Sequence, residues 1–141
     1  MVENIFFKSD LFDIEEGEDE ETNPRMYGRQ LANWLRERLI EKGYEVEDVI
    51  PEDWGWCVIC AREPYWLWVG CSSVTDYDTA KPGDPPPKKE KVTWACFATA
   101  EVPFFKRIFK RINTEPGLSK LTASLNEIIK CESHIKVVNE P

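Results

Sequence analysis

The sequence predicts a single domain of the α+β class, in which an antiparallel sheet of about four to five strands is covered by a long N-terminal helix and accompanied by two shorter helices. The chain has 141 residues, which is the common size of one domain. Apolar residues form 42% and aromatic residues 12% of the composition, enough to build one hydrophobic core. Strand-like segments separated by short turns occupy the middle of the chain, and helical periodicity occupies segments on either side of them.

The first helix is expected over residues 24–42. Asn23 and Pro24 form a helix-start signal, because Asn can cap free backbone N–H groups and Pro at the first helical position loses no hydrogen bond. Gly43 is suited to end the helix in the left-handed conformation. The positions that would form the buried face are Tyr27, Leu31, Trp34, Leu35 and Leu39.

The remaining elements follow from alternation, periodicity and turn residues. Strands are expected over 44–50, 54–61, 65–71 and 91–100, with a short edge strand over 135–138. Helices are expected over 102–113 and 118–131, separated by a break at Gly117. The loops expected within the domain are an acidic loop over 13–22 and a proline- and lysine-rich loop over 77–91.

Negative charge is concentrated in the first part of the chain. The formal net charge is −8, and residues 1–60 alone carry a net charge of −10. This balance argues against a general nucleic-acid binder or a protein of anionic membrane surfaces, since both need a positive field. Concentrated acidity instead favours a basic protein partner. The candidate partner-binding residues are Asp13, Glu15, Glu16, Glu18, Asp19, Glu20, Glu21, Glu52 and Asp53.

The leading functional hypothesis is therefore an acidic binding or inhibitor protein, comparable to an immunity protein or to an inhibitor of a nucleic-acid-handling enzyme. The alternative interpretation of the acidic loop is that it only keeps a tryptophan-rich protein soluble. The N-terminal segment lacks the pattern of a secretory signal, and no apolar run approaches the ~18 to 20 residues that cross a bilayer. We therefore expect a cytoplasmic protein outside the membrane.

The tryptophans offer a second candidate site. Residues two apart on a strand share a face, so we expect Trp54 to point the same way as Trp56, and Trp66 the same way as Trp68. Gly55 would let an aromatic ring from a neighbouring strand lie close over the backbone. The alternative function is thus a small-molecule or peptide-binding module, with or without weak enzymatic activity. Its pocket would comprise Trp54, Trp56, Trp66 and Trp68, with Arg62, Glu52 and Asp53 as polar groups. The competing interpretation is a tryptophan-rich core beneath the first helix.

The five cysteines predict reduced, buried thiols and no metal site. Cys57 and Cys60 have the spacing of a CxxC motif, but two residues three apart on a strand face opposite ways. We expect Cys57, Cys60, Cys71 and Cys96 to be buried strand residues. The sequence contains a single histidine, His134, and no phosphate-binding or hydrolase motif, so we expect no cofactor and no catalytic residues.

The run from Tyr27 to Trp56 resembles a pattern of small uncharacterised bacterial proteins, which implies a bacterial or phage origin and transfers no activity. The positions that carry the resemblance are Tyr27-Gly28, Leu31-Ala32, Trp34-Leu35, Gly43-Tyr44 and Glu52 to Trp56.

Overall fold

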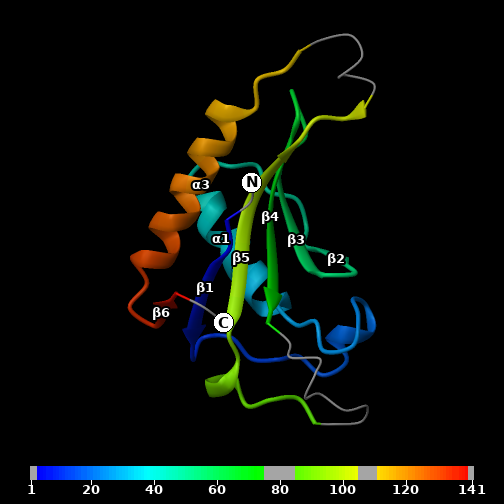
Figure 1. Cartoon of the computed structure of the whole chain (residues 1–141), viewed down its shortest axis with the longest axis vertical. Coiled ribbons are helices and arrows are strands. Elements are labelled where there is room, and N and C mark those ends of the chain that lie inside the picture. Colours follow the sequence, from blue (N-terminus) through cyan, green and yellow to red (C-terminus); the bar gives the residue numbers. More distant parts are fainter. Residues whose placement is uncertain (1–2, 75–84, 105–110, 140–141) are drawn as a thin grey trace.

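The computed structural model describes residues 3–74, 85–104 and 111–139 (Figure 1). Within them the chain forms six strands, two α-helices and two short 3-10 helices. The α+β class with one antiparallel sheet is confirmed, but the sheet has six strands rather than four to five. In chain order the elements are β1 (Ile5–Ser9), η1 (Glu18–Glu20), α1 (Arg29–Glu41), β2 (Ile50–Glu52), β3 (Gly55–Ala61), β4 (Trp66–Ser73), η2 (Lys89–Lys91), β5 (Trp94–Glu101), α3 (Glu115–Lys130) and β6 (Ile135–Val138).

The sheet has the strand order β2-β3-β4-β5-β1-β6, and every neighbouring pair is antiparallel. Strand β1 was not predicted, because its apolar run is only Ile5-Phe6-Phe7. It nevertheless lies inside the sheet, where Phe6 pairs with Ala95 of β5 and with Val138 of β6. Both termini of the described chain are therefore held by the same part of the sheet.

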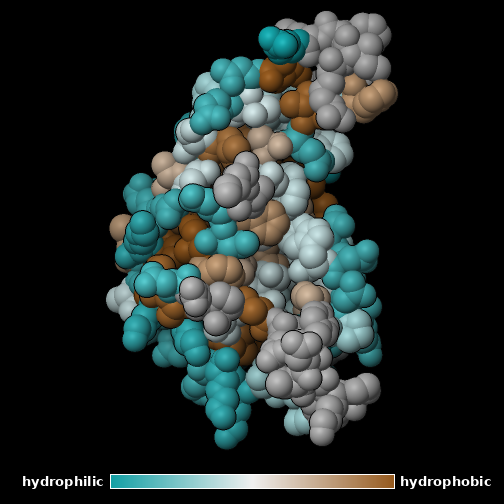
Figure 2. Space-filling model, in the orientation of Figure 1, coloured by the Kyte–Doolittle hydropathy of each residue, from teal (hydrophilic) through white to brown (hydrophobic). Residues whose placement is uncertain are grey.

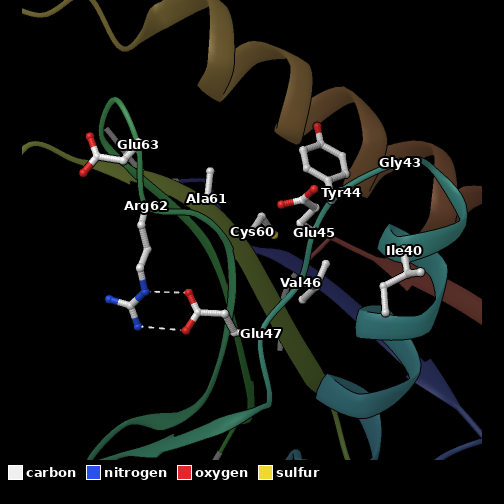
Figure 3. A pocket seen from close by; sticks show the side chains of 10 residues that line it. All are labelled: Ile40, Gly43, Tyr44, Glu45, Val46, Glu47, Cys60, Ala61, Arg62 and Glu63. Carbon is white, nitrogen blue, oxygen red and sulfur yellow. Dashed lines mark hydrogen bonds and ion pairs between the residues drawn. The ribbon is translucent and has the colours of Figure 1, made fainter.

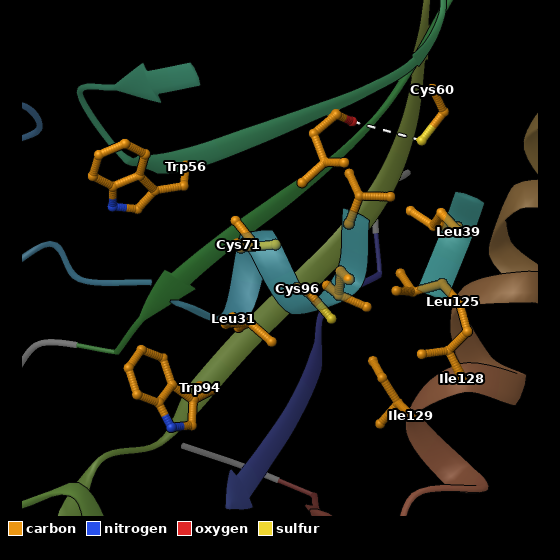
Figure 4. Close-up of a cluster of buried hydrophobic side chains, with 14 of the residues drawn as sticks. Leu31, Leu39, Trp56, Cys60, Cys71, Trp94, Cys96, Leu125, Ile128 and Ile129 are labelled. Atoms are coloured by element: carbon orange, nitrogen blue, oxygen red, sulfur yellow. Dashed lines mark hydrogen bonds between the residues drawn. The ribbon is translucent and has the colours of Figure 1, made fainter. Parts of the chain in front are cut away.

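Helices α1 and α3 pack on the same face of the sheet, which we call the inner face (Figure 1). Helix α1 lies mainly over β3 and β4, and α3 lies mainly over β5 and β6. The sequence assigned the cover to one long helix, whereas two helices of 13 and 16 residues share it. The core between helices and sheet includes Leu31, Leu39, Trp56, Cys71, Trp94, Cys96, Leu125 and Ile129 (Figure 4). Hydrophilic residues line the flanks of the molecule, and apolar residues appear between them (Figure 2).

Helix α1 begins at Arg29, five residues later than the expected start at Pro24. The helix-start interpretation of Asn23 was wrong, because its side-chain Nδ2 donates to the backbone oxygen of Asp53 at 2.8 Å instead of capping a helix. Gly28 occupies the cap position with φ of 141°, which disfavours residues that carry a Cβ. The end of the helix agrees with expectation, since Gly43 follows it with φ of 99°.

Strands β3, β4, β5 and β6 lie within a few residues of the strands that the sequence predicts over 54–61, 65–71, 91–100 and 135–138. The strand expected over 44–50 is wrong, because this segment is irregular up to Ile50, where β2 begins. Pro51 lies within β2 at the sheet edge, where its missing N–H costs no internal hydrogen bond.

The break expected at Gly117 is wrong, because this residue lies inside α3, which begins two residues earlier at Glu115. A Cβ at position 117 would overlap the hydroxyl oxygen of Tyr65, so this glycine serves the close approach of the helix to the start of β4. The helix expected over 102–113 falls mostly on residues 105–110, which lie outside the described residues. The same is true of residues 77–84 of the proline- and lysine-rich loop, while Lys89–Lys91 forms η2.

Candidate binding surface

The β2–β3 turn places Trp54 on the face of the sheet opposite the helices, which we call the outer face. Glu52 pairs with Gly55, so Asp53 and Trp54 form a two-residue turn. Gly55 has φ of 150°, a conformation that interrupts the regular alternation of side chains. As a result Trp54 lies on the outer face, while Trp56 is 2% exposed in the core on the inner face. The expectation that these two tryptophans share a face was wrong, and Trp56 is removed from the candidate ligand-binding residues.

Trp54 belongs to an aromatic cluster on the outer face. Its ring stacks on Trp68 with centroids 5.4 Å apart, and both rings contact Phe97 at 5.6 and 5.5 Å. Gly70 lies beneath the cluster, since a Cβ there would come within 2.6 Å of Phe97 Cε1 and 2.9 Å of Trp54 Cζ3. The glycine that lets aromatic rings lie on the backbone is therefore Gly70, whereas Gly55 faces the carbonyl oxygen of Cys71.

A small hollow opens beside this cluster, and we call it the tryptophan hollow. Its volume is about 210 Å³. It is lined by Glu52, Trp54, Cys57, Ile59, Trp66, Trp68 and Glu101. Trp66 and Trp68 share the outer face as their spacing predicts, and Trp66 at the rim is 37% exposed. The apolar side chains of Cys57 and Ile59 form the floor, and they are 6% and 8% exposed. Sequence reasoning missed Glu101, which only the pairing of Trp66 with Glu101 across β4 and β5 brings to the hollow.

Two carboxylates give the tryptophan hollow a negative potential. Glu52 and Glu101 are both exposed, and neither side chain forms a hydrogen bond or ion pair within the described part of the chain. Burial, followed by the negative charges of Glu52 and Glu101, raises the pKa of the Cys57 thiol to about 12. The hollow therefore combines aromatic walls with two carboxylates that have no partner among the described residues.

Arg62 lies next to the hollow but its charge is already paired. Its Nε and Nη2 donate to the two carboxylate oxygens of Glu47 at 2.5 and 2.9 Å, and this hydrogen-bonded pair lowers the pKa of Glu47 (Figure 3). Its guanidinium also lies 5.4 Å from the centroid of the Trp66 ring. Arg62 therefore lies beside the hollow, against Trp66, and is not a free cation for an anionic ligand.

A wider groove lies on the other side of the Arg62–Glu47 pair (Figure 3). Its volume is about 920 Å³, and its lining runs from the end of α1 along residues 43–47 to the β3–β4 turn. Cys60 lines the groove, but burial raises the pKa of its thiol to about 12, so it is protonated at neutral pH. His134 is at the opposite edge of the sheet, where it faces Asp10 at 3.4 Å. The described groove therefore contains no pairing of a nucleophile with a histidine base.

The acidic segment has one member that is structural. Glu18 was expected to contact a partner, but its side chain is 2% exposed. Its Oε1 accepts hydrogen bonds from the backbone N–H groups of Gly28 at 2.8 Å and Arg29 at 3.0 Å, and its Oε2 accepts one from Glu15 at 2.7 Å. Glu18 thus caps the N-terminus of α1 from ten residues upstream of Gly28, and this removes it from the partner-binding residues.

Four other members of that segment are engaged within the chain. Asp19 accepts a hydrogen bond from the backbone N–H of Arg25 at 2.9 Å. Asp13 pairs with Lys89 at 3.3 Å. Glu15 and Glu21 both approach Arg29, at 3.5 and 4.0 Å. These surface pairs are weak and solvated, so they reduce the local charge without burying it.

Four predicted carboxylates remain exposed, with no side-chain partner among the described residues, and we call them the acidic edge. They are Glu16, Glu20, Glu52 and Asp53. The hydrogen bond from Asn23 to Asp53 brings the segment after η1 against the β2–β3 turn, so the two acidic segments lie side by side (Figure 1). Glu52 belongs to both the acidic edge and the tryptophan hollow.

The cysteines follow their predicted arrangement. Cys60 lies in the inner core and Cys57 under the tryptophan hollow, so the two residues of the CxxC motif face opposite sides of β3. Four cysteines are buried, and only Cys131 is exposed. No group of three or more His, Cys, Asp or Glu side chains suited to a metal ion occurs in the part of the chain that the structure describes.

We expect thiol chemistry to follow this burial. A thiol reagent at mildly alkaline pH should modify Cys131 rapidly and the other four cysteines only after unfolding. Burial raises the pKa of Cys57 and Cys60 from 9.0 to about 12. The free energy of unfolding should therefore keep the full contribution of these thiols below pH 9.0. It should fall between pH 9.0 and about 12, because the unfolded state loses its thiol protons first. Rapid modification of two or more thiols in folded protein would contradict the prediction.

Comparisons of the chain with protein-family models, curated proteins and solved structures found no match. Among the described residues, no helix has the length and apolar character needed to cross a membrane.

Proposed function

We propose that this is a cytoplasmic binding protein that recognises a basic partner protein, in the manner of an immunity protein or an inhibitor of a nucleic-acid-handling enzyme. The observation that carries the proposal is the position of the acidic edge directly beside the tryptophan hollow, with Glu52 in both. Exposed carboxylates steer a basic partner toward the surface and set its orientation. Aromatic side chains beside them supply apolar area of the kind that dominates binding energy at interfaces.

The proposed contact surface is narrower than the acidic stretch of the sequence. It comprises Glu16, Glu20, Glu52 and Asp53, whose carboxylates have no partner among the described residues to lose on binding. Asp13, Glu15 and Glu21 can add to the field, although each already faces a basic side chain. Asp19 and Glu18 are excluded from direct contact because they accept backbone hydrogen bonds.

The proposal is tested by two variants that each remove four negative charges, one from the acidic edge and one from another part of the surface. One variant carries Glu16→Gln, Glu20→Gln, Glu52→Gln and Asp53→Asn. The matched control carries Glu37→Gln, Glu41→Gln, Glu45→Gln and Asp48→Asn, all on exposed positions of α1 or the segment after it. The probe is a blocked lysine-rich peptide, with affinity measured by calorimetry at low and high salt.

We expect the acidic-edge variant to lose about tenfold or more in affinity at low salt, and the control to lose about threefold or less, because charges beyond ~10 Å are screened. Binding by the wild type should weaken as salt rises. Equal losses in the two variants would show that only net charge matters and would refute a localised contact surface.

A second candidate function is a small-molecule or peptide-binding module, which the tryptophan hollow favours. Aromatic walls with a few polar groups are typical of ligand sites. If this function is correct, small neutral or cationic compounds should change the tryptophan emission. Replacement of Glu16 and Glu20 should leave that change unaltered. Emission that stays constant throughout a compound screen would count against it.

A further inference from the structure

The size of the tryptophan hollow restricts what can occupy it. Its volume is about 210 Å³, whereas sites for drug-sized ligands and cofactors measure about 300 to 1,000 Å³. The hollow is open at the rim, where Trp66 is 37% exposed, and closed at the floor by Cys57 and Ile59. These dimensions suit a single long side chain that enters from a partner surface.

The chemistry of the walls restricts the side chain further. Among the described residues, the charged side chains that line the hollow are those of Glu52, at the end of β2, and Glu101, at the end of β5. An anionic group would be repelled by the two carboxylates there. A cation would meet both carboxylates and the electron-rich faces of the tryptophan rings.

The protein itself contains examples of the geometry that such a cation would adopt. The guanidinium of Arg62 lies 5.4 Å from the ring centroid of Trp66, and that of Arg29 lies 5.5 Å from the ring centroid of Trp56. A guanidinium is planar, weakly hydrated and able to stack on indole while it donates to carboxylates in its own plane. An ammonium group is a more strongly hydrated point charge and gains less from the ring faces.

We propose that the tryptophan hollow seats an arginine side chain of the basic partner, with the guanidinium against Trp54, Trp66 and Trp68 and hydrogen-bonded to Glu52 and Glu101. The inference rests on the proposed function and deepens it, since it names the residue type that the surface recognises. Glu101 becomes a specificity-determining residue that lies outside the acidic edge.

The test compares three blocked peptides of lysine and glycine that differ only at a central arginine, citrulline or lysine. Citrulline keeps the shape of arginine and removes its charge. Binding is measured by calorimetry for the wild type, for Glu101→Gln and for the control Glu90→Gln, which removes an exposed carboxylate elsewhere. Far-UV circular dichroism and urea midpoints confirm that each variant is folded. Indole N–H resonances report which tryptophans respond.

We expect the wild type and Glu90→Gln to prefer the arginine peptide over the citrulline peptide by about tenfold. Glu101→Gln should reduce this preference to about threefold or less while it retains binding of the lysine peptide. The arginine peptide should shift the resonances of Trp54, Trp66 and Trp68 and leave those of the buried Trp56 and Trp94 unchanged.

The outcomes separate this inference from the proposed function. Equal binding of all three peptides, lost in the acidic-edge variant, would refute the arginine seat and leave the basic-partner proposal standing. A preference for lysine over arginine would refute it as well. Failure of every peptide to bind at low salt would overturn both proposals.

Discussion

Replacement of Gly55 by alanine is expected to destabilise the fold by about 4 kcal/mol, because it combines backbone strain with a steric clash. Gly55 has φ of 150°, and a Cβ there would overlap the carbonyl oxygen of Cys71 and lie 2.9 Å from the Cβ of Ser72. Neither neighbour can move freely, since both belong to β4, which pairs with β3 and β5. Urea unfolding followed by circular dichroism measures the loss.

Gly43→Ala is the matched control for this prediction. Gly43 has φ of 99°, but a Cβ there would meet nothing within 4 Å, so only the strain of the backbone remains. We expect a loss of about 1 kcal/mol. Similar losses in the two variants would mean that β4 yields to the added methyl group, and the close approach at Gly55 would then have no energetic importance.

Replacement of Glu18 by alanine is expected to cost about 3 kcal/mol of stability. The substitution removes the acceptor of three backbone hydrogen bonds, two of which come from the start of α1. The freed N–H groups of Gly28 and Glu15 would be left without that acceptor in a largely buried place. Glu18→Gln keeps one carbonyl oxygen and should lose about half as much.

Glu20→Ala is the control, because Glu20 lies in the same 3-10 helix but its exposed side chain has no partner among the described residues. The free energy of unfolding of the Glu20→Ala protein should stay within about 0.5 kcal/mol of the wild-type value. A Glu18→Ala protein as stable as Glu20→Ala would show that the cap is dispensable. It would also return Glu18 to the candidate partner-binding residues.

The local pattern of the sequence was sufficient for the elements whose neighbours are close in the chain. Strands β3, β4 and β5 are largely apolar runs; a short turn joins β3 to β4, and β5 continues the same antiparallel meander after a longer loop. The period-two geometry of a strand predicted that Cys57 and Cys60 face opposite ways and that Trp66 and Trp68 face the same way. Helix α3 was predicted to within three residues at its start, because its apolar positions repeat with helical spacing.

The candidate site was predicted only in part, because some of its residues meet only through contacts between segments far apart in the chain. Glu52, Trp54, Trp66 and Trp68 were identified from composition and spacing, and they do line one hollow. Glu101 was missed, because it lies 35 residues from Trp66 and meets it only through the register of β4 and β5. Trp56 was included wrongly, because period-two reasoning assumes that Trp54 and Trp56 lie on one strand, whereas Trp54 lies in the turn before β3 begins at Gly55.

The sequence by itself determined the α+β class, the thiol burial and the clustering of acids and tryptophans, since each depends on residue type and on spacing along one segment. The tertiary structure alone decided the insertion of β1 between β5 and β6, the cap by Glu18 and the meeting of the acidic edge with the tryptophan hollow. Each of these joins segments far apart in the chain. Local propensity carries no information on such contacts, because their free energy arises only when the sheet and helices have packed.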